Sequence, residues 1–319
     1  MLEQKILSEC NNELQRELIN LFHSSNLPLH FNKTGNKEFT NYHRISIIIL
    51  FRRSKKSLRD FVNEITESKW ISWLGLKKFP KKSTLHDWIK MFKMKTIRQL
   101  LNSLKPKKIS LTAIDGTGFD SWQKSKHYEK RVGEVHLPHM PYAKADLFID
   151  VKTRKVLDFS LLTKRVHDSK VAKKIFKRNK LKNIIVLADR GYDGEPLHEL
   201  VREKGGIMYA PVRKMCKSNK IKPRGRFRKE CLNLPDFMGQ RSIIESINFS
   251  LKSKQITALR SKKKDMKQKE FGWHMILYNI RMNINNKGNN SVGKATELKV
   301  NFFLLKIEIY VIPDNAFLT

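Results

Sequence analysis

The stretch LTAIDGTGF at residues 111–119 decides the fold, together with VLADRGYDG at residues 186–194. In each stretch a short apolar run leads directly into an aspartate, Asp115 or Asp189, and a glycine follows at once or after one arginine. Short apolar runs bounded by turn residues indicate buried strands. We therefore expect each aspartate at the end of a buried strand, at the sheet edge where open α/β folds place polar sites. Either acid taken alone also fits a plain turn or helix-capping role.

The segments around these two runs alternate between strand and helix patterns. Strands are expected at residues 109–114, 143–151, 156–163, 184–188 and 207–212. Helices are expected at residues 168–178, 194–204 and, as one long segment, about 239–285. This order of elements predicts an α/β domain with a mixed sheet.

The first hundred residues have helical patterns instead. Apolar residues recur at helical spacing after Ser57 and again after Ser83, and each serine is placed to cap the helix that follows it. Two short helices with a rim of lysine and arginine resemble a helix-turn-helix unit. A plain helical bundle with a solvated basic rim fits the pattern about equally well.

The overall charge indicates a polyanionic partner. The chain has 319 residues, 40% of them hydrophobic, and its 65 Lys+Arg against 30 Asp+Glu give a formal charge of +35. Nucleic acids and membrane surfaces are the common polyanions. The longest apolar run, Ile45 to Phe51, is too short to span a bilayer, no secretory signal is visible, and three separated cysteines indicate neither a zinc site nor disulfides. We expect a cytoplasmic, nucleoid-associated protein that contacts nucleic acid and no membrane.

The most basic stretch lies close to a third acid. Nine of the 17 residues from 213 to 229 are lysine or arginine, and none is acidic. Downstream, Arg241, Glu245 and Lys252 share one polar stripe of an expected helix. An ordinary surface pair explains Arg241 and Glu245 but not why the stripe adjoins so many cations. We expect DNA phosphates to be held by Arg213, Lys214, Arg224, Arg226 and Arg228.

The three acids Asp115, Asp189 and Glu245 can together hold two divalent metal ions. Carboxylate oxygens are hard ligands that suit two Mg²⁺ (or Mn²⁺) ions. Two such ions can activate a water or a 3′-hydroxyl and stabilise the leaving oxygen in phosphodiester chemistry. A basic protein with a carboxylate metal site is therefore a candidate for cutting or joining nucleic acid.

Three sequence blocks resemble the signature blocks of DDE transposases of prokaryotic insertion sequences. The blocks are LTAIDGTGF (111–119), VLADRGYDG (186–194) and RSIIESINFSLK (241–252), and KSLRDF…FPKKSTLHDW (56–88) is similar to that family's N-terminal region. The last block has the family's R-(3)-E-(6)-K spacing. One departure is Met238, which stands where the family often has tyrosine.

The resemblance implies a ribonuclease H-like catalytic domain with Asp115, Asp189 and Glu245 as catalytic and metal-binding triad. It also implies that Lys252 contacts DNA near the cleaved end and that Arg241 supports the site. Only 55 residues separate Asp189 from Glu245, so the catalytic domain is expected to be compact.

The predicted organisation has three parts: residues 1–105 form a helical, helix-turn-helix-like DNA-binding region, residues 106–285 the catalytic domain, and residues 286–319 a tail that is either an added strand or an extension. The expected enzyme cuts the terminal inverted repeats of double-stranded DNA and joins them to target DNA, as a homo-oligomer. Two alternatives stay open, a structure-specific metal-dependent nuclease and a catalytically silent DNA-binding protein.

Overall fold

The chain folds around one five-stranded sheet in a computed structural model that describes residues 11–31, 34, 37–120, 143–163, 166–213, 223 and 225–308, with side chains described for residues 13–286 of these ranges. The strand order is β3-β2-β1-β4-β5. The bounds are β1 Leu111–Phe119, β2 Ala143–Asp150, β3 Val156–Leu162, β4 Ile185–Ala188 and β5 Ile207–Tyr209. Pairing is antiparallel between β1, β2 and β3 and parallel from β1 through β4 to β5. The predicted mixed sheet and ribonuclease H-like α/β class are confirmed.

The first strand is longer than the sequence indicates. The apolar run predicts an end just before Asp115, but β1 continues to Phe119. The reason is its antiparallel neighbour β2, which pairs with β1 as far as Phe119 and Ala143. Asp115 therefore lies within a strand, at the level where the shorter parallel partner β4 ends.

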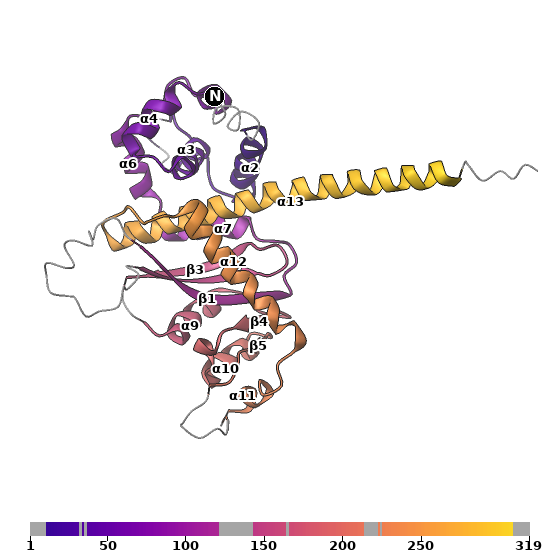
Figure 1. Ribbon diagram of the computed structural model, residues 1–319. Helices are drawn as coiled ribbons and strands as arrows, with labels where there is room; N and C mark the ends of the chain where they lie inside the picture. The colour runs from indigo at the N-terminus through magenta and orange to yellow at the C-terminus, as the bar shows by residue number, and fades with distance from the viewer. Residues whose placement is uncertain are drawn as a thin grey trace, which may run out of the picture.

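Helices cover both faces of the sheet (Figure 1). Their bounds are α7 Met94–Ser103, α9 Asp168–Arg178, α10 Glu195–Glu203, α12 Ile243–Ser250 and α13 Lys264–Glu308. Alternate strand residues point to opposite faces. Ile114 and Phe148 pack in the core that contains α9 and α10, whereas Ala113 and Leu147 pack in the core that contains α7, α12 and α13.

In the described part of the chain before α7, five further helices are present: α2 Asn11–Ser24, α3 Asn41–Ser54, α4 Leu58–Thr66, α5 Trp70–Trp73 and α6 Lys82–Met91. Ser57 caps α4 as predicted, since its side chain accepts a hydrogen bond from the Asp60 N–H. The predicted cap at Ser83 is wrong. Helix α6 begins at Lys82, two residues before the start that a cap at Ser83 would give, and Lys81 is at the N-cap position, so Ser83 already has helical backbone.

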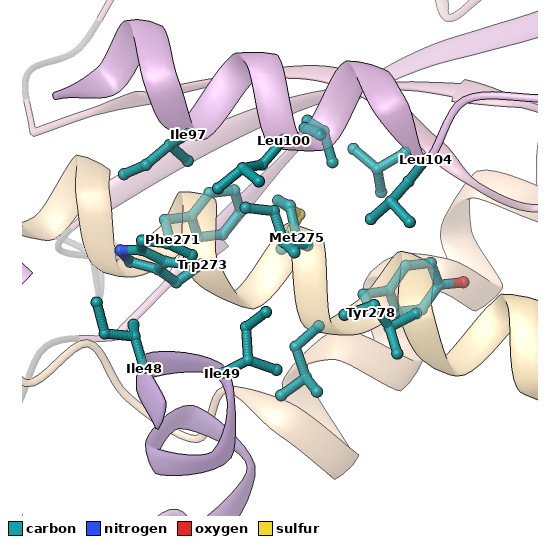
Figure 2. Packing of buried hydrophobic residues seen from close by; sticks show 14 of the residues in the cluster. Ile48, Ile49, Ile97, Leu100, Leu104, Phe271, Trp273, Met275 and Tyr278 are labelled. Carbon is teal, nitrogen blue, oxygen red and sulfur yellow. The ribbon is translucent and has the colours of Figure 1, made fainter. Parts of the chain in front are cut away.

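The N-terminal helices and the sheet share one hydrophobic core. Figure 2 shows α13 between α7 and α3, with Trp273 and Phe271 of α13 facing Ile97 and Ile48. The Trp273 side chain is fully buried. Helix α13 thus serves as a common packing partner for the helices before residue 105 and for the sheet after it.

The C-terminal part is more broken than the single predicted helix at 239–285. It contains α11 Arg226–Glu230, the 3₁₀ segment η2 Asp236–Ser242, α12, the π-helical segment η3 Leu251–Gln255 and α13. The helical backbone ends with η3. A few residues later, the Leu259 N–H donates a hydrogen bond to the Asp120 carbonyl at 2.8 Å. This tertiary contact overrides the local helical pattern. Helix α13 extends into the predicted tail as far as residue 308, and residues 309–319 lie outside the described part.

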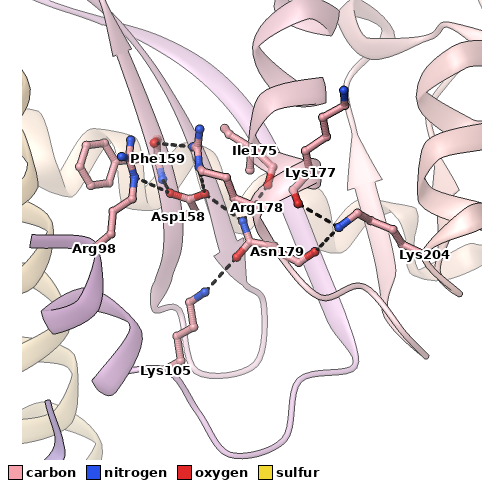
Figure 3. Close-up of polar contacts among 9 residues, drawn as sticks. All are labelled: Arg98, Lys105, Asp158, Phe159, Ile175, Lys177, Arg178, Asn179 and Lys204. Atoms are coloured by element: carbon pink, nitrogen blue, oxygen red, sulfur yellow. Dashed lines mark hydrogen bonds and ion pairs between the residues drawn. The ribbon is translucent and has the colours of Figure 1, made fainter. Parts of the chain in front are cut away.

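A buried acid on β3 joins the sheet to its flanking helices (Figure 3). Asp158 accepts hydrogen bonds from Arg178 Nε at 3.0 Å and Asn179 Nδ2 at 2.9 Å, and it forms an ion pair with Arg98 of α7. Lys105 donates to Asn179 Oδ1 at 2.9 Å. The network fixes α7 and α9 to opposite sides of the same strand. Among the described residues, no helix has a stretch both long and apolar enough to pass through a membrane.

Candidate active site

Two of the predicted acids meet at the middle of the sheet. Strands β1 and β4 run in parallel, and their last registered pair is Ile114 with Ala188. Asp115 directly follows Ile114 and Asp189 directly follows Ala188, so the two acids lie side by side. By alternation both face the side of the sheet that α12 covers.

Helix α12 brings the third acid to this face. Ile244 and Ile247 are buried and hold the helix on the core, whereas the Glu245 side chain is 58% exposed. Asn248, one turn further along, donates from Nδ2 to Asp115 Oδ2 at 3.3 Å. The helix therefore contacts the first acid directly while it presents the third acid to solvent.

Arg241 is the direct partner of Glu245. Its Nη2 lies 2.7 Å from Glu245 Oε1, and the two residues are one helical turn apart. This is the surface pair that the spacing of the two residues predicts. The Arg241 guanidinium also lies close enough to Asp115 for its charge to lower the pKa of that acid.

The electrostatics of Asp115 connect the three acids. Burial raises the pKa of Asp115 from 3.8 to about 6. The backbone N–H of Gly116 and the charge of Arg241 lower the pKa, and the negative charges of Asp189 and Glu245 raise it again. Asp115 therefore lies close enough to both other acids to be affected by their charges, and a cation placed beside it would relieve that repulsion.

The acids do not form a closed ligand cage. Within the described ranges, no three side chains from histidine, cysteine, aspartate and glutamate are close enough together to hold a metal ion. Glu245 is directed at Arg241, and Asp189 Oδ1 accepts a hydrogen bond from the Arg190 N–H at 2.6 Å. The chemistry of the donors fits a hard divalent cation, because all three groups are carboxylates.

The predicted DNA contacts divide into two groups. Arg226 and Lys252 are exposed, and Lys252 Nζ lies 5.8 Å from the centre of the Phe119 ring. Arg213 and Arg228 instead direct their guanidinium groups at the protein itself. Lys214 and Arg224 lie outside the described residues.

Sequence reasoning assigns no role to three residues around the site. Asn248 lies on the same polar stripe as Glu245 and was identifiable from that spacing. Tyr192 is buried, and its hydroxyl donates to Asp146 Oδ1 at 2.9 Å. The only signal for Asp146 is an acid within the apolar run of β2.

A mixed sheet with two acids on adjacent strands and a third on the covering helix defines a ribonuclease H-like catalytic domain. The family model of the transposase DDE domain matches residues 106–280, more than half of the chain, and the chain belongs to this family. It is a DDE-type DNA transposase, an enzyme class that cleaves and transfers DNA strands with divalent metal ions.

One solved structure similar to this chain is a cryo-EM structure of a piggyBac transposase synaptic complex with hairpin DNA. It is 12% identical, the match covers 86% of this chain and 74% of the other, and the TM-score is 0.46. No curated protein matches the chain.

Proposed function

We propose that this transposase cuts double-stranded DNA at the terminal inverted repeats of its element and joins the freed 3′-hydroxyl to target DNA, with Asp115, Asp189 and Glu245 as catalytic residues. The observation that supports the assignment is the placement of Asp115 and Asp189 side by side after the last registered pair of β1 and β4, with Glu245 on the helix α12 that contacts Asp115 through Asn248. Carboxylates gathered in this way can take up divalent cations, which a phosphodiester site needs.

Asp115, Asp189 and Glu245 would hold two Mg²⁺ or Mn²⁺ ions, which supply activation of the attacking hydroxyl and charge for the leaving oxygen. The chain's own residues prepare these ligands. Asn248 orients one oxygen of Asp115, and Arg241 holds one oxygen of Glu245.

The surface beside the acids suits a DNA backbone. The exposed cations Arg226 and Lys252 lie along the segment that leads into and out of α12, and each can contact a phosphate. We assign end recognition to the helical region of residues 1–105 and chemistry to residues 106–285. Because two element ends need two active sites, the working form is a homo-oligomer on DNA.

The test uses labelled duplexes that carry the element ends. Asp115→Asn, Asp189→Asn and Glu245→Gln should each abolish cleavage in Mg²⁺ or Mn²⁺ while binding of the same duplex is retained. Asp120→Asn, an exposed acid just after β1, is the matched control and should cleave like the parent. Full cleavage by any of the three variants would overturn the assignment of that acid.

Pre-cut ends separate the transposase from its alternatives. A transposase joins a pre-cut 3′ end to a supercoiled target, whereas a structure-specific nuclease hydrolyses DNA and yields no joined product. A silent DNA-binding protein would show a steep salt dependence of binding and neither product.

A further inference from the structure

The segment that follows Asp189 is a tight turn with two sets of anchors. Asp189 caps the 3₁₀ turn η1 (Arg190–Tyr192), and its position depends on how that turn is held. On the inner side, the buried Tyr192 hydroxyl is fixed to Asp146 of β2. On the side away from β2, two arginines of the basic stretch hold the turn and the residue after it.

Arg213 forms hydrogen bonds to the backbone of this turn. Its Nε donates to the Arg190 carbonyl at 2.6 Å, and its Nη2 donates to the Gly191 carbonyl. Its own N–H donates to Asp193 Oδ2 at 2.8 Å. Both carbonyls belong to the two residues directly after Asp189, so Arg213 limits how that acid can move.

Arg228, near the other end of the basic stretch, binds Asp193, the residue that follows the turn. Its Nε and Nη2 each lie 2.7 Å from one oxygen of Asp193, which is the bidentate geometry of a strong charge-assisted pair. The side chains of Arg228 and Asp193 are only 11% and 0% exposed. Burial by itself would raise the pKa of Asp193, but the hydrogen bonds from Arg228 and Arg213 outweigh it and lower that pKa.

A second carboxylate holds the backbone around Arg228. Glu195, the first residue of α10, accepts the N–H of Phe227 at 2.9 Å and that of Arg228 at 3.1 Å. The start of the short helix α11 is thereby attached to the start of α10. Arg228 thus approaches Asp193 from a fixed backbone.

We infer that Arg213 and Arg228 are positioning residues for Asp189 and do not serve as phosphate contacts. Together with Asp193 and Glu195 they form a structure that we call the turn clamp. The inference rests on the proposed role of Asp189 as a metal ligand, and it replaces the DNA-binding role that the basic composition of residues 213–229 predicts for these two arginines. Both guanidinium groups are directed at protein oxygens, and the Arg228 side chain presents little surface to a DNA strand.

The test compares Arg228→Lys and Arg228→Gln with Arg226→Gln in the full-length protein. Lysine keeps the charge, so it preserves a phosphate contact, but it cannot reproduce a bidentate fork on Asp193. Cation binding is followed with Tb³⁺ luminescence, since Tb³⁺ is a hard, oxygen-seeking substitute for Mg²⁺. DNA binding is followed as the dependence of affinity on salt concentration.

The turn clamp predicts opposite outcomes for the two positions. Arg228→Lys should weaken Tb³⁺ binding about tenfold, in the range for groups that orient metal ligands, and leave the salt dependence unchanged. Arg226→Gln should leave Tb³⁺ binding unchanged and reduce the salt slope by about 0.9, the value for one lost phosphate contact. If Arg228→Lys binds Tb³⁺ like the parent, or Arg228→Gln lowers the salt slope as Arg226→Gln does, the inference is wrong.

Two further variants keep the result interpretable. Arg213→Lys tests the clamp at its other end and serves in place of Arg228→Lys should that variant not fold, as judged by near-UV circular dichroism. Asp189→Asn tests the proposed function alone. Normal Tb³⁺ binding by Asp189→Asn would reject the metal ligand itself, whereas impaired binding there with a normal Arg228→Lys would reject only the clamp.

Discussion

Replacement of Asp115 by asparagine should make the metal-free protein more stable at neutral pH. Burial is the main cause that raises the pKa of Asp115 to about 6 from 3.8. The folded protein thus holds this proton more tightly than the unfolded chain does. As pH rises from about 4 to 6, the wild type must ionise a carboxylate that the fold disfavours, and it loses stability. Asparagine keeps the shape and the oxygen that accepts from Asn248 but carries no charge.

The size of the effect follows from the two pKa values. At 1.36 kcal/mol for each pH unit, the difference between 3.8 and about 6 corresponds to about 3 kcal/mol above pH 7. At about 2.1 cal/mol/K of unfolding entropy for each of the 319 residues, this is a gain in Tm of about 4 °C. Because the side chain is only partly buried, we expect a gain of about 2–4 °C.

The assay is thermal unfolding in EDTA from pH 4 to pH 7.5, for the wild type, Asp115→Asn and the control Asp120→Asn. The Tm difference between Asp115→Asn and wild type should be small near pH 4 and grow to its full size by pH 7. Added Mg²⁺ or Mn²⁺ should raise the Tm of the wild type more than that of Asp115→Asn. A Tm difference that stays flat across this pH range would refute the reasoning.

Three further predictions concern stability and are checked by urea denaturation. Gly272→Ala should destabilise by about 1–3 kcal/mol although alanine favours helices, because the new Cβ would lie 2.6 Å from Ile97 Cγ2; a stabilised variant would contradict this packing. Glu270→Ala should cost about 3–5 kcal/mol, since it leaves the buried Arg52 guanidinium without its carboxylate; a loss below 1 kcal/mol would count against the buried pair. Tyr192→Phe should lower the free energy of unfolding by about 1–3 kcal/mol, because buried Asp146 loses the hydroxyl that donates to it. An unchanged free energy of unfolding would contradict a stabilising role for this hydrogen bond.

The strands and two of the acids were predictable because local pattern and tertiary structure agree there. The runs before Asp115 and Asp189 are buried on both faces of the sheet, so they read as continuous apolar segments. What the sequence could not give was the length of β1, which depends on pairing with a strand about thirty residues away. The break between α12 and α13 was missed for the same reason, since it depends on the contact of Leu259 with Asp120.

Charge was the least reliable guide to individual residues. Arg226 and Arg228 are two positions apart in the same basic run, yet one is exposed and the other is paired with Asp193. Composition reports how many cations a segment has but not which carboxylate each one meets after folding. The pairing of Arg228 with Asp193 joins positions 35 residues apart, and no local spacing rule covers such a distance.

The position of α13 late in the sequence affects how the protein can fold during its synthesis. Helices α3 and α7 bury their apolar faces against a helix whose first residue, Lys264, follows the end of α7 by about 160 residues. At about 5–20 residues per second, the ribosome needs roughly 10–30 s to supply it. Until then, the apolar side chains of α3 and α7 that pack on α13 lack this partner, although the N-terminal helices also pack on one another. A nonsense mutation before α13 would remove this common partner, and it would leave uncovered the apolar side chains of α3 and α7 that pack on α13.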